Sequence, residues 1–180
     1  MADQSNIDPE HIAELRGFLR GFAMLHQALG IGLYDYDVVV LPIEGSVEET
    51  LQTRFSALGQ KLKPPVKKWD ITLVELDPWE QVAEEMFSRW LLADEDLRDY
   101  YRERRLRDPR PGEVHVGNND IARVLREQLA VVVGPEKPPV WGVSLRALVG
   151  ASDRYLATLD DHLAFELGGE LLLLTFAVNR

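Results

Sequence analysis

One stretch of the chain, residues 36–79, has the pattern of a complete strand–helix–strand crossover. Its first strand, 37–43 (Asp-Val-Val-Val-Leu-Pro-Ile), is apolar and β-branched without polar alternation, which is typical of a strand covered on both faces. Ser46 and Glu49 have the spacing of a capping box, so a helix is predicted to begin there. A second strand is predicted over 69–76. Two strands joined by a helix normally lie parallel in one sheet, with a right-handed crossover.

The C-terminal part of the chain suggests a second crossover. A short strand is predicted over 140–143, with a short helix or turn over 144–149. Ser152 then caps a predicted helix that ends at Gly168-Gly169, before a buried strand over 170–178. The alternative pairs 162–167 with 170–178 as a hairpin across the two glycines. Four leucines favour the helix because they recur at helical spacing: Leu156, Leu159, Leu163 and Leu167.

These patterns predict an α/β fold: a three-layer domain with a mostly parallel sheet and helices on both faces. The four predicted strands are 38–43, 71–76, 140–143 and 171–178. At 180 residues, the chain is long enough for one domain with a sizeable core. The expected organisation is a single domain over 1–180, with an N-terminal helix 9–29, a β-α-β unit 37–76, a helical insertion 78–133 and a C-terminal β-α-β unit 140–178.

The composition excludes several classes of protein. Apolar residues make up 46% and charged residues 28% of the chain, as in ordinary soluble globular proteins. The absence of cysteine excludes disulfides, thiolate zinc sites and thiol nucleophiles. The net charge of −10 argues against non-specific binding to nucleic acid. No apolar run is long enough to span a bilayer and residues 1–5 lack a signal-peptide pattern, so a cytoplasmic location without membrane contact is expected.

No motif for catalysis, for a metal or for a cofactor stands out. The turn 42–46 lacks both the P-loop Lys-Ser/Thr pair and three spaced glycines. The acidic residues around 84–96 are too irregular for a calcium loop and indicate solvated surface, as does the run 160–162 with Glu166 on a predicted helix. The four histidines are not at metal-ligand spacing, and no partner base can be assigned to the one in the loop 115–119: His11, His26, His115 and His162. We therefore assign no catalytic, metal-binding or cofactor-binding residue.

One segment, 100–110, is locally basic in this acidic chain and has two tyrosines at its start. Arginines beside tyrosines are favoured at protein interfaces. The alternative is a helix end at which the arginines complement the helix dipole and pair with nearby acidic residues. The segment supplies the predicted partner-binding residues: Tyr100, Tyr101, Arg104, Arg105, Arg107 and Arg110.

Three places in the sequence carry a resemblance to a known family. The run 34–37 (Tyr-Asp-Tyr-Asp) is followed after a short gap by a helix rich in leucine and arginine, the run 70–79 is a strand leading directly into a helix, and 140–178 has a closing strand–helix–strand layout. This layout resembles the small accessory B component of bacteriophage-exclusion (BREX) defence systems. The resemblance implies a non-catalytic partner of a larger defence complex that includes a phosphatase-like component.

Two functional classes compete on this basis. One is a non-catalytic accessory or adaptor protein of a bacterial multi-protein assembly, with other protein subunits as its partners. The other is an acidic immunity-type inhibitor that blocks the basic active site of a toxin. An enzyme or nucleotide-binding protein, with a site at the C-terminal ends of the strands, is a third alternative. The adaptor is favoured because a blocker of a basic nuclease has little reason to expose the arginine-rich segment.

Overall fold

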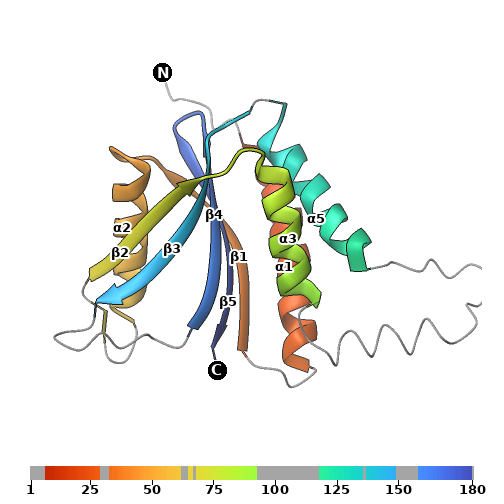
Figure 1. Cartoon of the computed structure of the whole chain (residues 1–180), viewed down its shortest axis with the longest axis horizontal. Helices are drawn as coiled ribbons and strands as arrows, with labels where there is room; N and C mark the ends of the chain where they lie inside the picture. The colour runs from red at the N-terminus through yellow and green to blue at the C-terminus, as the bar shows by residue number, and fades with distance from the viewer. Residues whose placement is uncertain are drawn as a thin grey trace, which may run out of the picture.

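A computed structural model describes residues 7–28, 33–61, 65–66, 68–92, 118–135, 137–148 and 158–179 (Figure 1). The helices in these ranges are α1 (Pro9–Ala28), α2 (Val47–Gly59), α3 (Trp79–Leu92) and α5 (Asn118–Val133). The strands are β1 (Leu33–Pro42), β2 (Lys68–Glu75), β3 (Val140–Leu148), β4 (Thr158–Leu167) and β5 (Glu170–Asn179).

The strands form one five-stranded sheet in the order β1-β5-β4-β3-β2, and every neighbouring pair is antiparallel. The prediction of a three-layer domain with a mostly parallel sheet is therefore wrong, because no neighbouring pair of these strands is parallel. Helix α2 does connect two strands that run in the same direction, β1 and β2, but these strands lie at opposite edges of the sheet. The local pattern of a crossover does not show that three later strands will insert between the two strands it joins.

The C-terminal part of the sheet is a hairpin. Strands β4 and β5 pair from Thr158 opposite Asn179 to Leu167 opposite Glu170. Gly168 and Gly169 form the turn, both with positive φ, as tight hairpin turns prefer. The predicted helix ending at residue 167 is wrong, and the hairpin alternative is confirmed. The predicted helix or turn over 144–149 is also wrong, because β3 continues to Leu148.

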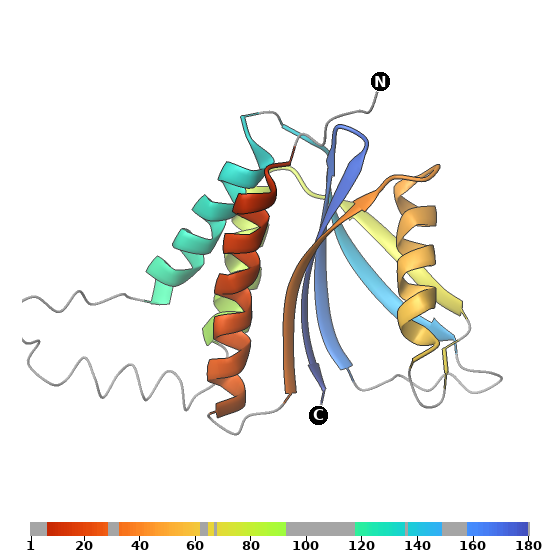
Figure 2. The ribbon, with the colours of Figure 1, turned by 180° about the vertical axis from the view of Figure 1, so that it is seen from behind.

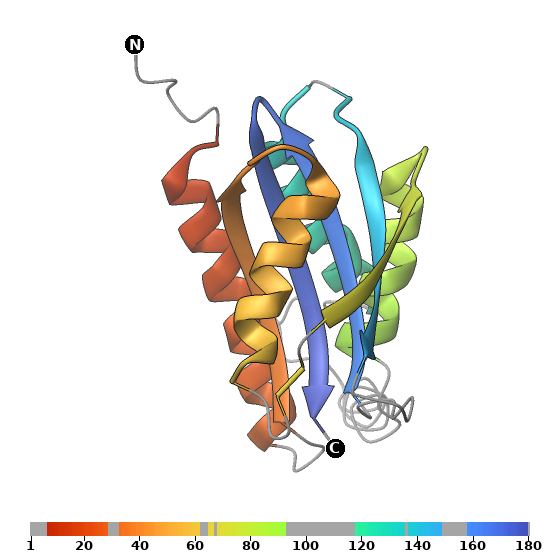
Figure 3. The same ribbon diagram turned by 90° about the vertical axis from the view of Figure 1, so that its left-hand side faces the viewer.

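Helices cover the two faces of the sheet unequally. Helices α1, α3 and α5 lie on one face, with α5 between the other two, whereas α2 lies alone on the opposite face (Figures 1 and 3). The side chains of β5 point alternately into the cores on the two sides of the sheet. Leu172, Leu174 and Phe176 face the three helices, and Leu171 and Leu173 face α2. All five of these side chains are buried. Because β5 is buried on both faces, its apolar run does not alternate with polar residues.

Helix α1 covers the outer edge of β1, as Figure 2 shows. The Ile43 amide donates to the Gly169 carbonyl, so the odd-numbered residues of β1 bond to β5 and the even-numbered ones point their backbone groups outward. Arg16 donates two hydrogen bonds, of 2.7 and 3.1 Å, to the outward carbonyl of Val38. Gln27 donates to the carbonyl of Tyr34 at 3.1 Å. These contacts protect an edge that would otherwise be open to another strand.

A buried polar contact joins α1, β1 and α3. The Tyr36 hydroxyl donates to the Trp90 carbonyl at 3.2 Å and lies 2.8 Å from His26 Nδ1. Both Tyr36 and His26 are 1% exposed. Burial raises the pKa of the Tyr36 phenol, and the neighbouring Tyr34 raises it further. The phenol therefore stays protonated and remains a donor.

Replacing Tyr36 with phenylalanine tests this contact. We expect Tyr36→Phe to lower the free energy of unfolding by about 1–3 kcal/mol, because the buried Trp90 carbonyl and His26 lose their contacts with the Tyr36 hydroxyl. Since the folded-state pKa of Tyr36 lies above its unfolded value of about 10, the wild type loses stability as pH rises past that value. Denaturant unfolding at several pH values should therefore show that the difference in the free energy of unfolding between the wild type and Tyr36→Phe becomes smaller above pH 10. Equal stabilities at neutral pH would contradict the assignment.

Two glycines with open space around them provide a matched test of backbone conformation. Gly169 has φ +90° in the hairpin turn, Gly17 lies in α1, and a Cβ at either position meets no atom within 4 Å. We expect Gly169→Ala to destabilise the protein by roughly 1–2 kcal/mol, because alanine resists positive φ. We expect Gly17→Ala to stabilise it by roughly 0.5–1 kcal/mol, because alanine favours a helix. Thermal unfolding measures whether each variant is more or less stable than the wild type. If both variants changed stability in the same direction, the result would contradict the hairpin turn.

Candidate functional site

The structure leaves the predicted contact segment untested. All six predicted partner-binding residues lie outside the described residues: Tyr100, Tyr101, Arg104, Arg105, Arg107 and Arg110. His115 also lies outside them. The segment therefore stays a prediction, and the candidate site described below is built from other residues.

The described buried histidines have packing roles. His162 is 4% exposed, its Nδ1 lies 3.0 Å from Thr175 Oγ1, and its ring contacts Phe55 on the α2 side of the sheet. His26 belongs to the Tyr36 contact described above. Within the described ranges, no group of three or more histidine, cysteine, aspartate or glutamate residues could hold a metal ion.

The predicted solvated helix face at 160–162 is wrong, because these residues belong to β4. Asp161 lies on the face of the sheet that α3 covers. Its carboxylate accepts hydrogen bonds from Arg89 at 2.7 Å and from the indole of Trp90. Asp161 thus fixes the last turns of α3 to the sheet.

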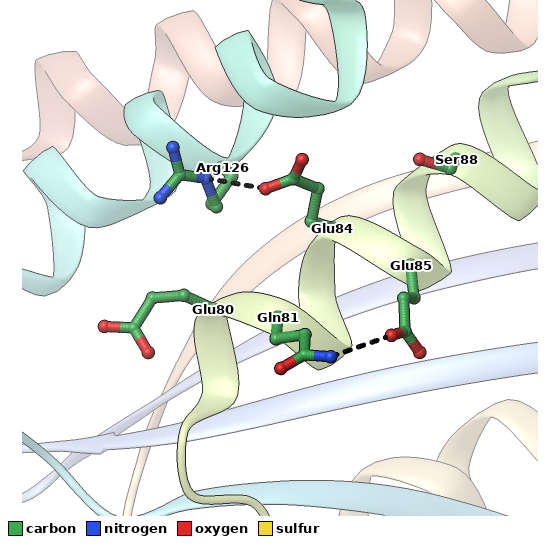
Figure 4. A pocket seen from close by; sticks show the side chains of 6 residues that line it. All are labelled: Glu80, Gln81, Glu84, Glu85, Ser88 and Arg126. Carbon is green, nitrogen blue, oxygen red and sulfur yellow. Dashed lines mark hydrogen bonds and ion pairs between the residues drawn. The ribbon is translucent and has the colours of Figure 1, made fainter. Parts of the chain in front are cut away.

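The outer surface of α3 carries a concavity lined by polar residues. Five residues of this helix are buried at helical spacing and anchor it in the core: Trp79, Ala83, Met86, Phe87 and Trp90. The same 3.6-residue period places Gln81, Glu84, Glu85 and Ser88 on the other side of the helix, as Figure 4 shows. We call this side the α3 surface.

The first groove on the α3 surface lies between α3 and α5 and has a volume of about 620 Å³. Glu84 pairs with Arg126 of α5 at 3.2 Å, and Gln81 donates to Glu85 at 3.3 Å (Figure 4). Glu80 and Glu85 have no ion pair with any residue in the described ranges. The lining therefore carries more carboxylates than cations, and the one arginine is already paired: Glu80, Gln81, Glu84, Glu85, Ser88 and Arg126.

The second groove lies between α3 and strands β2 to β4 and has a volume of about 200 Å³. Val74 of β2 is 55% exposed and Val82 of α3 is 38% exposed, so two apolar side chains meet solvent here. The Arg89–Asp161 pair also lines this groove. Glu85 lines both grooves, which makes the α3 surface continuous with strand β2.

Sequence reasoning assigned Glu84 and Glu85 to solvated surface and missed the groove. The spacing of Gln81, Glu84, Glu85 and Ser88 indicates one exposed helix side, so the side of the groove that α3 forms was predictable. The side of the groove that α5 forms was not predictable, because Arg126 lies on α5 and no local sequence pattern indicates that α3 packs against α5. The exposure of Val74 was also missed, because helices were expected to cover both faces of the sheet.

Comparisons with protein-family models, with curated proteins and with solved structures find no match to this chain. Among the helices in the described ranges, none combines the length and apolar character that crossing a bilayer requires. In an antiparallel sheet the carboxyl ends of neighbouring strands lie at opposite ends of the sheet. The C-terminal strand ends, where an enzyme or nucleotide site was predicted, therefore do not come together in this sheet.

Proposed function

We propose that this chain is a non-catalytic adaptor that binds a basic segment of a partner protein in the groove between α3 and α5. The observation that carries the proposal is the pair Glu80 and Glu85. Both line an open groove, and neither has an ion pair within the described part of the chain. Among the described residues, an incoming arginine or lysine would therefore gain a partner without breaking an existing ion pair.

The charge of the whole chain supports the same type of partner. A net charge of −10 attracts a basic surface over longer distances and raises the rate of encounter. The ion pair between Glu84 and Arg126 links α3 to α5 and so holds the two sides of the groove together. The groove thus combines negative charge with a defined shape, as recognition of a specific partner requires.

The resemblance to the accessory B component of BREX systems supports the adaptor class, and we propose a defence complex as the assembly. The basic segment 100–110 is proposed as a second contact, for an acidic region of another subunit. An immunity-type inhibitor is the alternative, because an acidic groove also fits a basic toxin. The identity of the captured partner distinguishes the two classes.

A capture experiment with the full chain tests the proposal. Wild-type protein is immobilised, exposed to native host extract, and the bound proteins are identified by mass spectrometry. We expect Glu80→Lys to lower recovery of the main partner about tenfold, because it replaces attraction with repulsion in the groove. Glu14→Lys is the matched control, since it makes the same charge change at an exposed position of α1. It should leave recovery unchanged.

Four outcomes bear on the proposal. Recovery of several subunits of one assembly supports the adaptor, whereas one small basic nuclease supports the inhibitor. If Glu80→Lys and Glu14→Lys lowered the recovery of the partner equally, only the net charge would matter for binding. That result would overturn the proposal that the groove binds the partner. A thermal shift with a nucleotide or a metal ion would count against a pure interaction protein.

A further inference from the structure

Strand β2 is an edge strand whose outer backbone groups point away from the sheet. The Leu76 amide donates to the Val140 carbonyl, so the even-numbered residues of β2 bond to β3. The backbone N–H and C=O groups of Trp69, Ile71 and Leu73 therefore face outward. None of these backbone groups has a hydrogen bond to another residue in the described ranges.

The two edges of the sheet differ in this respect. Arg16 and Gln27 bond to outward carbonyls of β1, whereas nothing comparable from the described residues covers β2. Strand β2 also has no proline, and its pairing with β3 continues from Lys68 to Glu75 without a bulge. Such a strand is a template for another strand.

We propose that two copies of this chain pair through β2, antiparallel about a two-fold axis, so that their sheets become continuous. A two-fold axis normal to the sheet keeps the α2 side of each copy on the same side. Opposite residues must then both be odd-numbered or both even-numbered. In the register we propose, Ile71 lies opposite Ile71 of the second copy and Trp69 lies opposite Leu73.

This register is selected by the side chains it brings together. On the α2 side it forms a ladder of Trp69, Ile71 and Leu73 from both copies, and all three are partly buried apolar residues packed against the α2 core. A shift of one position toward the C-terminus places Trp69 opposite Glu75. A shift in the other direction places Asp70 opposite Asp70, which is unfavourable because like charges repel.

Charges on the α3 side agree with the same register. Lys68 lies opposite Val74 of the second copy, beside the groove that Glu85 also lines. Both Lys68 and Glu85 are exposed, and neither has an ion pair with another described residue. Each copy would therefore supply a cation to the other copy's Glu85, which has none among the described residues, while Asp70 faces the neutral Thr72.

Sedimentation of the purified full chain tests the pairing. We expect a reversible monomer–dimer equilibrium, weak because the contact is small. Lys68→Glu and Glu85→Lys should each weaken the dimer about tenfold, and the double variant should restore it. Glu80→Lys, which changes the α3–α5 groove alone, should leave the dimer unchanged, so this proposal and the proposed function fail separately. A wild type that stays monomeric up to about 1 mM would overturn the proposal.

The absence of cysteine allows a direct test of the register. Ile71→Cys places two sulfurs across the axis, at a Cα separation of about 5.5 Å, which lies within the range that disulfides span. We expect oxidation to yield a covalent dimer. Leu73→Cys is the matched control, because its two copies would be about 13 Å apart along the strands. A covalent dimer from Leu73→Cys but not from Ile71→Cys would contradict the proposed register.

Discussion

The pairing of β5 with both β1 and β4 is the constraint on which the rest of the structure depends. Strand β5 bonds to β1 through its odd-numbered residues and to β4 through its even-numbered ones. Its side chains enter both cores, with Leu172 and Leu174 under the three helices and Leu171 and Leu173 under α2. Neither core can close without this strand, since burial of these side chains stabilises both layers.

The strand order determines which surfaces stay open. Strands β5, β4 and β3 lie between β1 and β2 and leave these two strands at the edges of the sheet. Helix α1 covers the β1 edge with Arg16 and Gln27, and packing of α3 against α5 creates the acidic groove. Both proposed contacts, the groove and the β2 edge, thus follow from one topology and share Glu85.

The sequence predicted the local features of the fold but not its topology. Ser46 and Glu49 do form a capping box, with both reciprocal hydrogen bonds present. Local capping is predictable because both partners lie within one turn of chain. Strand order depends on contacts between distant residues, so the insertion of β3 to β5 between β1 and β2 left no local signal. The leucines at 163 and 167 suggested a helix because a spacing of four residues places two side chains on the same face of a helix, and it also places them on the same face of a strand.

The candidate site was predictable only in part, for the same reason. The exposed side of α3 follows from its helical period, whereas the groove needs Arg126 from another helix. The measurement that tests this topology most directly is NMR detection of Hα–Hα contacts across the sheet. Non-hydrogen-bonded antiparallel pairs bring Cα atoms to about 4.5 Å, so contacts are expected for Val38–Leu174 and Tyr36–Phe176. Contacts between β1 and β2 instead would contradict the topology, and with it both proposed surfaces.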